Sequence, residues 1–145
     1  MDLTIEPYAG VLPIRFGMPR AEVRRLLAPE VPVTKKLFVS PLPRDTFLQT
    51  GLHVYYRDPG CCEAVELFAP AAPTLHGQPI LGRPYTQVER WLLQLDPSSR
   101  LDPTGLRASQ LGVAVFIPSR VKSPNDSVQG VIAFDRGYYE RHGIA

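Results

Sequence analysis

A chain of 145 residues with 44% hydrophobic and 21% charged residues has the composition of one globular domain, which argues against wholesale disorder. Its net charge of +2 gives no electrostatic reason to expect a nucleic acid partner. Since no run of about 18 apolar residues is present, the sequence also predicts no transmembrane helix, and we expect no membrane partner.

The start of the chain and its two cysteines favour a cytoplasmic protein. The first residues, MDLTIE, are acidic and no apolar segment follows them, so we expect no signal peptide. Cys61 and Cys62 are adjacent, and side chains at adjacent strand positions point to opposite faces and do not bridge without strain. We therefore expect two reduced thiols. The alternative, a vicinal redox pair or a soft-metal site, lacks a second cysteine pair.

Proline marks the boundaries of the predicted elements, because it breaks helix interiors and cannot donate a hydrogen bond to a β ladder. The chain contains 16 prolines, well above the average usage of roughly 5%. Two segments that begin at prolines, 19–28 and 84–95, have the apolar spacing of amphipathic helices. The apolar positions are Val23, Leu26 and Leu27 in the first segment and Val88, Trp91, Leu92 and Leu95 in the second. We expect Trp91 to anchor the core.

The remaining patterned segments predict short β-strands. They are 12–16, 37–40, 46–49, 52–57, 63–68, 111–117 and 130–134. A turn with the sequence Asp58-Pro59-Gly60 joins 52–57 to 63–68 as a hairpin. The long loop 118–129 separates the last two strands.

Residues 14–27 resemble residues 80–92 at an offset of 65 residues. The matched pairs are Gly17 and Gly82, Pro19 and Pro84, Val23 and Val88, Arg25 and Arg90, and Leu27 and Leu92. We expect each glycine where a strand turns sharply into a helix. Each half of the chain then contains a strand, a glycine turn, a helix and an antiparallel hairpin.

The sequence therefore predicts a single α+β domain built from two tandem strand–helix–hairpin repeats, which form an antiparallel sheet with the helices packed on one face. The first repeat covers about residues 11–69, a joint rich in proline and glycine covers 70–79, the second repeat covers about 80–137, and a C-terminal tail covers 138–145. The frame of the second hairpin stays open. Strand 52–56 corresponds either to 111–115 or to the segment one residue later.

The segment FGMPRAEVRRLL at 16–27 resembles the motif FGM-x-x-x-E-V-x-x-L-L. This motif begins the small bacterial modules found in the outer-membrane assembly lipoprotein BamE and, as tandem copies, in the β-lactamase inhibitory protein. The resemblance implies a helical layer on one face of an antiparallel sheet, with the sheet binding another protein. The chain departs from the family at Pro19 and Pro84, where Thr or Ser is usual, and it lacks the inhibitor's disulfides and an evident leader.

The sequence contains no motif for catalysis or metal binding. His53, His76 and His142 lie far apart and have no metal-ligand spacing, and there is no Gly-rich phosphate loop or G-x-S-x-G segment. A Cys61–His53 couple across the hairpin has no evident oxyanion donor or orienting carboxylate. We therefore expect no enzyme activity, no cofactor and no metal; an enzyme of unrecognised type is the lesser alternative.

One face of the predicted sheet has the composition of a protein-recognition surface. Alternation along the strands directs one set of side chains to the helices and the other set, aromatics mixed with His, Arg and Glu, to the opposite face. The residues expected to bind a partner are His53, Tyr55, Arg57, Phe68, Phe116, Tyr138 and Tyr139, and Ala64, Glu66, Ala114, Ile132 and Phe134 are expected beside them. The alternatives are that another part of the chain covers this face or that it forms a homodimer seam.

These features together predict a non-enzymatic protein-binding module, for example a bacterial immunity or inhibitor protein that masks a toxin or an enzyme. The partner is then that protein, or a second copy in a homodimer. The alternative from another functional class is a small-molecule-binding domain with its pocket between the two repeats.

Overall fold

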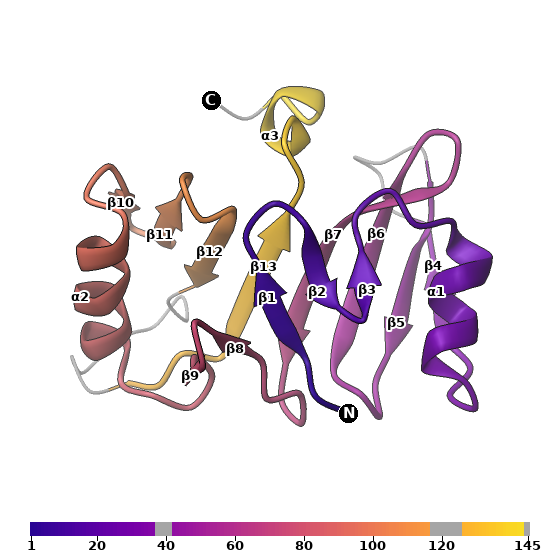
Figure 1. Cartoon of the computed structure of the whole chain (residues 1–145), viewed down its shortest axis with the longest axis horizontal. Coiled ribbons are helices and arrows are strands. Elements are labelled where there is room, and N and C mark those ends of the chain that lie inside the picture. The colour runs from indigo at the N-terminus through magenta and orange to yellow at the C-terminus, as the bar shows by residue number, and fades with distance from the viewer. Residues whose placement is uncertain (37–41, 117–125, 144–145) are drawn as a thin grey trace.

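The computed structural model describes residues 1–36, 42–116 and 126–143. Within these ranges the protein is an α+β structure with two sheets and three short helices (Figure 1). The large sheet is antiparallel, in the order β10 (Arg100–Asp102), β11 (Gly105–Ala108), β12 (Val113–Phe116), β13 (Gly130–Phe134), β7 (Cys61–Phe68), β6 (Leu52–Arg57), β5 (Arg44–Phe47) and β4 (Val33–Lys35). The small sheet is mixed, in the order β3 (Ile14–Arg15), β2 (Gly10–Leu12), β1 (Thr4–Glu6), β8 (Thr74–Leu75) and β9 (Gln78–Pro79). The helices are α1 (Arg20–Leu27), α2 (Tyr85–Leu95) and α3 (Tyr138–Arg141).

The α+β class and the antiparallel sheet are confirmed, and the small sheet is an addition that the sequence did not predict. Strands β6 and β13 begin and end at the predicted residues, and α1 and α2 each begin one residue after the predicted proline. The predicted strand 46–49 is found two residues earlier as β5, and the predicted strand 12–16 is divided between β2 and β3. The predicted strand 37–40 lies outside the described residues. Strands β1, β4 and β8 to β11 and helix α3 were not predicted.

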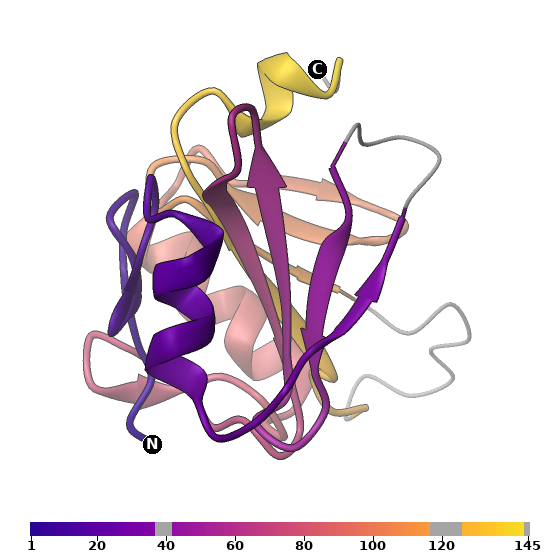
Figure 2. The ribbon, with the colours of Figure 1, turned by 90° about the vertical axis from the view of Figure 1, so that its right-hand side faces the viewer.

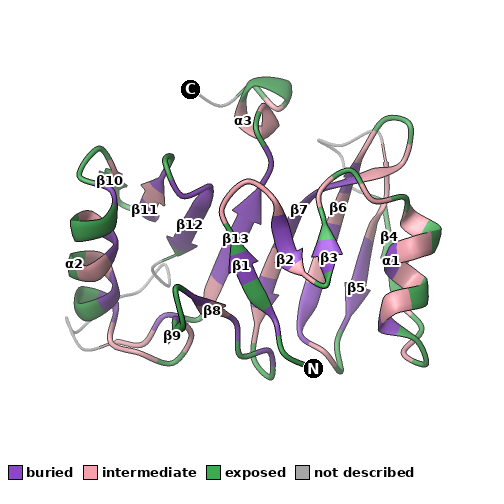
Figure 3. Cartoon of the chain, in the orientation of Figure 1, coloured by how far each residue is buried: buried purple, intermediate pink, exposed green. Residues whose placement is uncertain are grey.

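The core lies between the large sheet and a layer formed by α1, α2 and the small sheet. Figure 2 shows α1 and the small sheet on the same side of the large sheet, and Figure 3 shows buried residues along its central strands. The buried side chains that meet there include Leu52, Val54, Val65 and Leu67 of the large sheet, Val23, Leu27, Val88 and Leu92 of the helices, and Ile5, Val11 and Ile14 of the small sheet. We call this side of the large sheet the inner face and the opposite side the outer face. Trp91 is only partly buried and packs against this cluster.

Main-chain hydrogen bonds join the start of each of the two long helices to a later segment of the same half of the chain. A proline precedes each helix and makes no side-chain cap. The first helical N–H groups, which have no partner inside the helix, instead donate to main-chain carbonyls. The N–H of Arg20 donates to the oxygen of Gly60 at 3.1 Å, and that of Tyr85 donates to the oxygen of Asp126 at 2.7 Å. Tertiary hydrogen bonds therefore take the place of a side-chain cap at both helices.

The glycine turns before α1 and α2 are confirmed. Gly17 and Gly82 have φ angles of +91° and +82°, which residues with a side chain rarely adopt. The N–H of Gly17 donates to the oxygen of Cys62 at 2.8 Å, and that of Gly82 donates to the oxygen of Val128 at 3.0 Å. The same backbone conformation thus ties the chain to β7 at the first turn and to the segment just before β13 at the second.

A similar main-chain hydrogen bond occurs beside the last strand of each half. The N–H of Phe68 donates to the oxygen of Gly51, and the N–H of Phe134 donates to the oxygen of Gly112, both at 3.0 Å. When the halves are aligned on β7 and β13, the strand that follows Gly51 therefore matches the strand that follows Gly112. That alignment pairs β6 with β12.

The start of the predicted strand 111–117 is wrong, because β12 starts at Val113 rather than at residue 111. Leu111 belongs to the preceding turn, where its N–H donates to the oxygen of Ala108 at 3.1 Å. The alternating apolar pattern continues from the strand into this turn, and for that reason the sequence alone places the start of the strand too early.

A buried carboxylate joins α1 to the edge of the large sheet. Asp45 of β5 is fully buried, and Arg24 of α1 donates to its two oxygens at 2.8 and 2.9 Å. The hydroxyls of Tyr56 and Thr34 also donate to it, at 2.9 and 3.0 Å. Burial alone would raise the pKa of Asp45, but the hydrogen bonds from Arg24, Tyr56 and Thr34 outweigh it and hold the pKa below its usual value.

Replacing Asp45 with Asn should destabilise the protein at neutral pH by about 2 kcal/mol. The cost is below that of a fully buried pair because Arg24 is 40% exposed. Since the folded-state pKa of Asp45 is lowered, its contribution is present above the unfolded pKa and is lost as pH falls through the folded value. Urea denaturation between neutral and acid pH should therefore show a smaller acid loss in the variant. Glu22→Gln, which alters an exposed pair with Arg25, is the control and should change little.

Candidate functional site

The outer face of the large sheet carries one continuous row of side chains across its centre. The strand register places five residues opposite one another on neighbouring strands, namely His53, Glu66, Ile132, Ala114 and Arg107. Because side chains alternate between faces, all five lie on the same side of the sheet. The row is polar where it crosses β6 and β7 and apolar where it crosses β13 and β12.

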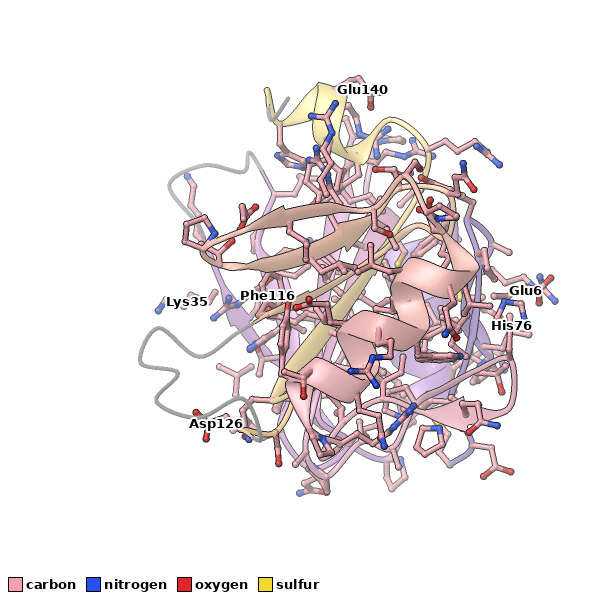
Figure 4. All side chains as sticks on the ribbon, turned by 90° about the vertical axis from the view of Figure 1, so that its left-hand side faces the viewer. Glu6, Lys35, His76, Phe116, Asp126 and Glu140 are labelled. Carbon is pink, nitrogen blue, oxygen red and sulfur yellow. The ribbon has the colours of Figure 1, made fainter. Side chains whose placement is uncertain are left out.

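Phe68 and Phe116 lie on the same face, two residues further along the strands than Glu66 and Ala114. Gly130 pairs with Phe68, and a Cβ atom at Gly130 would lie 3.8 Å from the ring of Phe116. Figure 4 shows Phe116 and Lys35 on the side of the molecule away from Glu6 and His76, which belong to the small-sheet side. The two phenylalanines are therefore separated from α1 and α2 by the large sheet.

A groove of about 500 Å³ lies on this face, over the strands from β10 to β13. It is lined by Ala114, Phe116 and Ile132 of the sheet, by Arg100 and Arg107, and by Tyr138 and Tyr139 of α3. Phe116 is 37% exposed, whereas Ala114 and Ile132 are almost fully buried. The groove thus combines an accessible aromatic ring with basic side chains.

Helix α3 covers the part of the outer face next to this groove. The ring of Phe134 stacks on Tyr138 at 5.8 Å and meets Tyr139 edge-on at 4.7 Å. Together with Ala64, Ala114 and Ile132 these rings form a second apolar cluster, separate from the main core. The alternative that another segment covers this face therefore holds for the region around Phe134.

A network of charged groups fastens α3 to the ends of β7 and β13. Glu63 is almost fully buried and accepts hydrogen bonds from Arg141 at 3.1 Å and His142 at 2.8 Å. Asp135 pairs with the same Arg141 and, at 3.4 Å, with Arg57. Burial raises the pKa of Asp135, and the nearby Arg141 and Arg57 oppose this rise. The predicted partner-binding residue Arg57 is therefore part of an internal ion-pair network.

His53 belongs to a polar group in the other half of the outer face. Its Nδ1 shares a hydrogen bond with the hydroxyl of Thr46 at 2.8 Å, and its Nε2 lies 3.9 Å from Glu66. Burial and the positive charge of Arg44 lower the pKa of His53 to about 4, so the ring is neutral near pH 7. The ring of Phe68 lies 4.8 Å away. His53 thus contributes an uncharged imidazole ring to the outer face.

The structure brings some of the predicted site residues together and keeps others apart. His53 lies beside Tyr55 and Phe68, and Tyr138 lies beside Tyr139, with ring centres 6.5, 4.8 and 5.4 Å apart. The supposed Cys61–His53 couple does not form, because Cys61 pairs with Arg57, four residues from His53 along β6 and roughly 13 Å away. Cys62 is buried, and burial raises the pKa of its thiol to about 12.

Sequence reasoning missed the basic wall of the groove, because β10 and β11 were not predicted. The signal was the segment RLDPTGLRA at residues 100–108, in which alternating side chains flank a Pro-Thr turn. Asp102 closes this turn by accepting the N–H of Thr104 at 2.7 Å. The hairpin sets Arg100 directly opposite Arg107 on the outer face.

In the described part of the chain, no group of three or more His, Cys, Asp or Glu side chains is placed to hold a metal ion. None of the helices in the described residues has the length and apolarity needed to cross a membrane. No protein-family model, curated protein or solved structure matches the chain. The resemblance of residues 16–27 to the BamE-like modules therefore stays a prediction.

Replacing Arg141 with Ala should loosen α3, because Glu63 and Asp135 then lose their shared guanidinium. We expect a destabilisation of about 1–2 kcal/mol in urea denaturation. We also expect faster hydrogen exchange at the amides of Arg141 and His142, which bond within the helix. Glu140→Ala, an exposed change on the same helix, is the control. Equal exchange in both variants would show that the charged network does not hold α3.

An NMR titration should find His53 protonating at about pH 4. Replacing Arg44 with Ala should move the pKa of His53 upward, since one of its two causes is removed, but not to the ordinary value of about 6.5, since burial remains. A wild-type midpoint near the ordinary value would contradict the buried, positively charged surroundings described for this ring.

Proposed function

We propose that this protein is a non-enzymatic protein-binding module that docks a partner on the outer face of its large sheet. The observation that carries the proposal is the groove of about 500 Å³ with Phe116 exposed at its floor. Aromatic and arginine side chains are enriched at the energetic centres of protein interfaces, and both occur here side by side. An immunity or inhibitor protein of the bacterial cytoplasm, which masks the surface of a toxin or an enzyme, fits such a face.

The proposal includes a tandem origin for the two halves. The glycine turns, the helix-start hydrogen bonds and the bonds from Phe68 and Phe134 occur at matching places. Glu30 accepts a hydrogen bond from the N–H of Gln49 at 2.7 Å, and Asp96 accepts one from the N–H of Gln110 at 2.9 Å. In each half, a carboxylate that follows the long helix in sequence thus binds the main chain of a later turn. A repeated unit explains why these bonds recur although few side chains match.

The outer faces of the two halves differ, and this difference supports a specialised groove in the second half. In the alignment of the halves, the polar group of Thr46, His53 and Glu66 corresponds to Arg107, Ala114 and Ile132. The first half therefore carries hydrogen-bonding groups where the second half carries an apolar floor and a cation. The resemblance to modules whose sheets bind proteins points in the same direction.

A small-molecule ligand is the second candidate, because the groove has a volume typical of ligand pockets, about 300–1,000 Å³. Its lining comes from the second half and the tail, whereas the sequence predicted a pocket between the two repeats. A thermal-shift screen of metabolites tests this candidate, since a ligand at 100 times its dissociation constant adds about 2.7 kcal/mol. A hit that Phe116→Ala abolishes would favour the small molecule over a protein.

Replacing Phe116 with Ala should weaken binding of a co-purified partner by at least about tenfold, measured by calorimetry with the purified components. Thermal stability should change little, because Phe116 is 37% exposed. Leu95→Ala is the matched control, since Leu95 is 38% exposed on α2, on the inner side of the sheet. Tyr55→Ala tests whether the contact extends to the first half. Unchanged affinity in both the Phe116 and Tyr55 variants would exclude the outer face as the docking surface.

A further inference from the structure

The wall of the groove holds two like charges in direct opposition. Arg100 of β10 and Arg107 of β11 are paired in the strand register and lie on the same face. Side chains in such a pair have Cβ atoms about 5 Å apart, and like charges placed there repel each other. The repulsion is relieved when an anionic group lies between or above the two guanidinium groups.

Other arginines of the chain have carboxylate partners inside the protein. Arg24 pairs with Asp45, Arg57 with Asp135, and Arg141 with both Glu63 and Asp135. Arg100 is exposed, and among the described residues no carboxylate lies within ion-pair distance of it. It is therefore available to a carboxylate of another molecule.

Arg107 is held in place where it meets the groove. Its guanidinium lies over the ring of Tyr139, 4.3 Å from the ring centre. Asp102 also lines the groove; it accepts the N–H groups of Thr104 and Gly105 at 2.7 and 3.1 Å, and the positive charge of Arg107 is one of the causes that lower its pKa. The groove thus presents the exposed Arg100 beside Arg107, which interacts with an aromatic ring and a carboxylate of the protein itself.

The floor below these cations is apolar and open along the sheet. Phe116 is exposed there, and the almost fully buried Ala114 and Ile132 lie beside it. A small ligand is normally enclosed over most of its surface, whereas an open groove suits an extended chain that lies along it. A peptide that fits both the apolar floor and the arginine beside it carries an apolar side chain next to a carboxylate.

We propose that the groove binds an acidic protein segment in which an aromatic or aliphatic side chain lies against Phe116 and a neighbouring Asp or Glu pairs with Arg100. This inference rests on the proposed function, since it names the chemistry of the partner at the same site. Because the carboxylate pairs with an exposed cation, charge steers the association and binding weakens as salt increases.

The test is selection of random linear peptides displayed on phage against the immobilised full-length protein. We expect the enriched peptides to share an apolar residue flanked by Asp or Glu. Fluorescence anisotropy with an enriched peptide should give an affinity that falls at least about tenfold between about 50 mM and about 500 mM salt. Arg100→Glu should weaken binding at least about tenfold while leaving the contact between Arg107 and Tyr139 in place.

Two further variants make the result decisive. Arg100→Gln removes the charge without reversing it and should weaken binding less than Arg100→Glu, which separates a charge effect from a misfolded hairpin. Arg90→Glu, an exposed change on α2 on the other side of the large sheet, is the charge-matched control and should not alter affinity. Equal losses in all three variants would contradict the specific role of Arg100.

The outcomes separate this inference from the proposed function. Peptides without acidic residues whose binding depends on Phe116 but not on Arg100 would overturn the acidic partner and keep the docking face. If no peptide is enriched, or if the enriched peptides bind equally to Phe116→Ala, the docking face and the acidic partner are both overturned. Enrichment of basic peptides would likewise overturn the charge argument.

Discussion

The antiparallel pairing of β7 with β13 is the contact on which the rest of the structure depends. Each is the last strand of its half, and they pair from Phe68 opposite Gly130 to Ala64 opposite Phe134. A further main-chain bond, from Asp135 to Glu63 at 2.9 Å, extends the pairing beyond the strand ends. Since the two last strands meet at the centre, the earlier strands of each half must extend outward. The sheet therefore ends in β4 on one side and in β10 on the other.

This arrangement also decides what covers the inner face. Helices α1 and α2 belong to opposite halves, so they lie apart, and the small sheet lies between them (Figure 1). Strand β2 contacts both β7 and β13, directly over the central pairing. The N-terminal strand β1 pairs with β8 of the joint between the halves, from Thr4 opposite Thr74 to Ile5 opposite Leu75. Segments outside the two helix–sheet units thus complete a core that the helices alone would leave open.

In the described part of the chain, no such continuous layer covers the outer face. The two halves of the sheet also carry different side chains on this face. In the first half, Thr46, His53 and Glu66 give the surface hydrogen-bonding groups, with the pKa of His53 lowered so that the ring stays neutral. In the second half, α3 covers Phe134, and the charged network around Glu63 holds the helix there. Between these regions the floor around Phe116 stays open beside two arginines. The proposed docking site is thus the part of the outer face that neither arrangement covers.

The sequence by itself determined the local elements with strong periodicity. Apolar spacing specified α1 and α2, alternation specified β6, β7 and β13, and Gly17 and Gly82 specified the turns before the helices, because each of these depends on residues close together in the chain. The assignment of aromatic residues to one sheet face followed from the same alternation. The short strands β1, β4, β8 and β9 have too few residues to show a period, and long-range pairing alone makes them strands.

Only the tertiary structure decided which surfaces are used internally and which stay accessible. Arg57 was expected to meet a partner, but it pairs with Asp135, a residue 78 positions away, and Tyr138 and Tyr139 pack on Phe134. Arg100 and Arg107 come together because a hairpin sets them opposite each other over the second half of the sheet. Alternation fixes the face on which a side chain lies, because it is a local property of the strand. Whether that side chain is covered, paired or free depends on segments that folding brings from elsewhere in the chain.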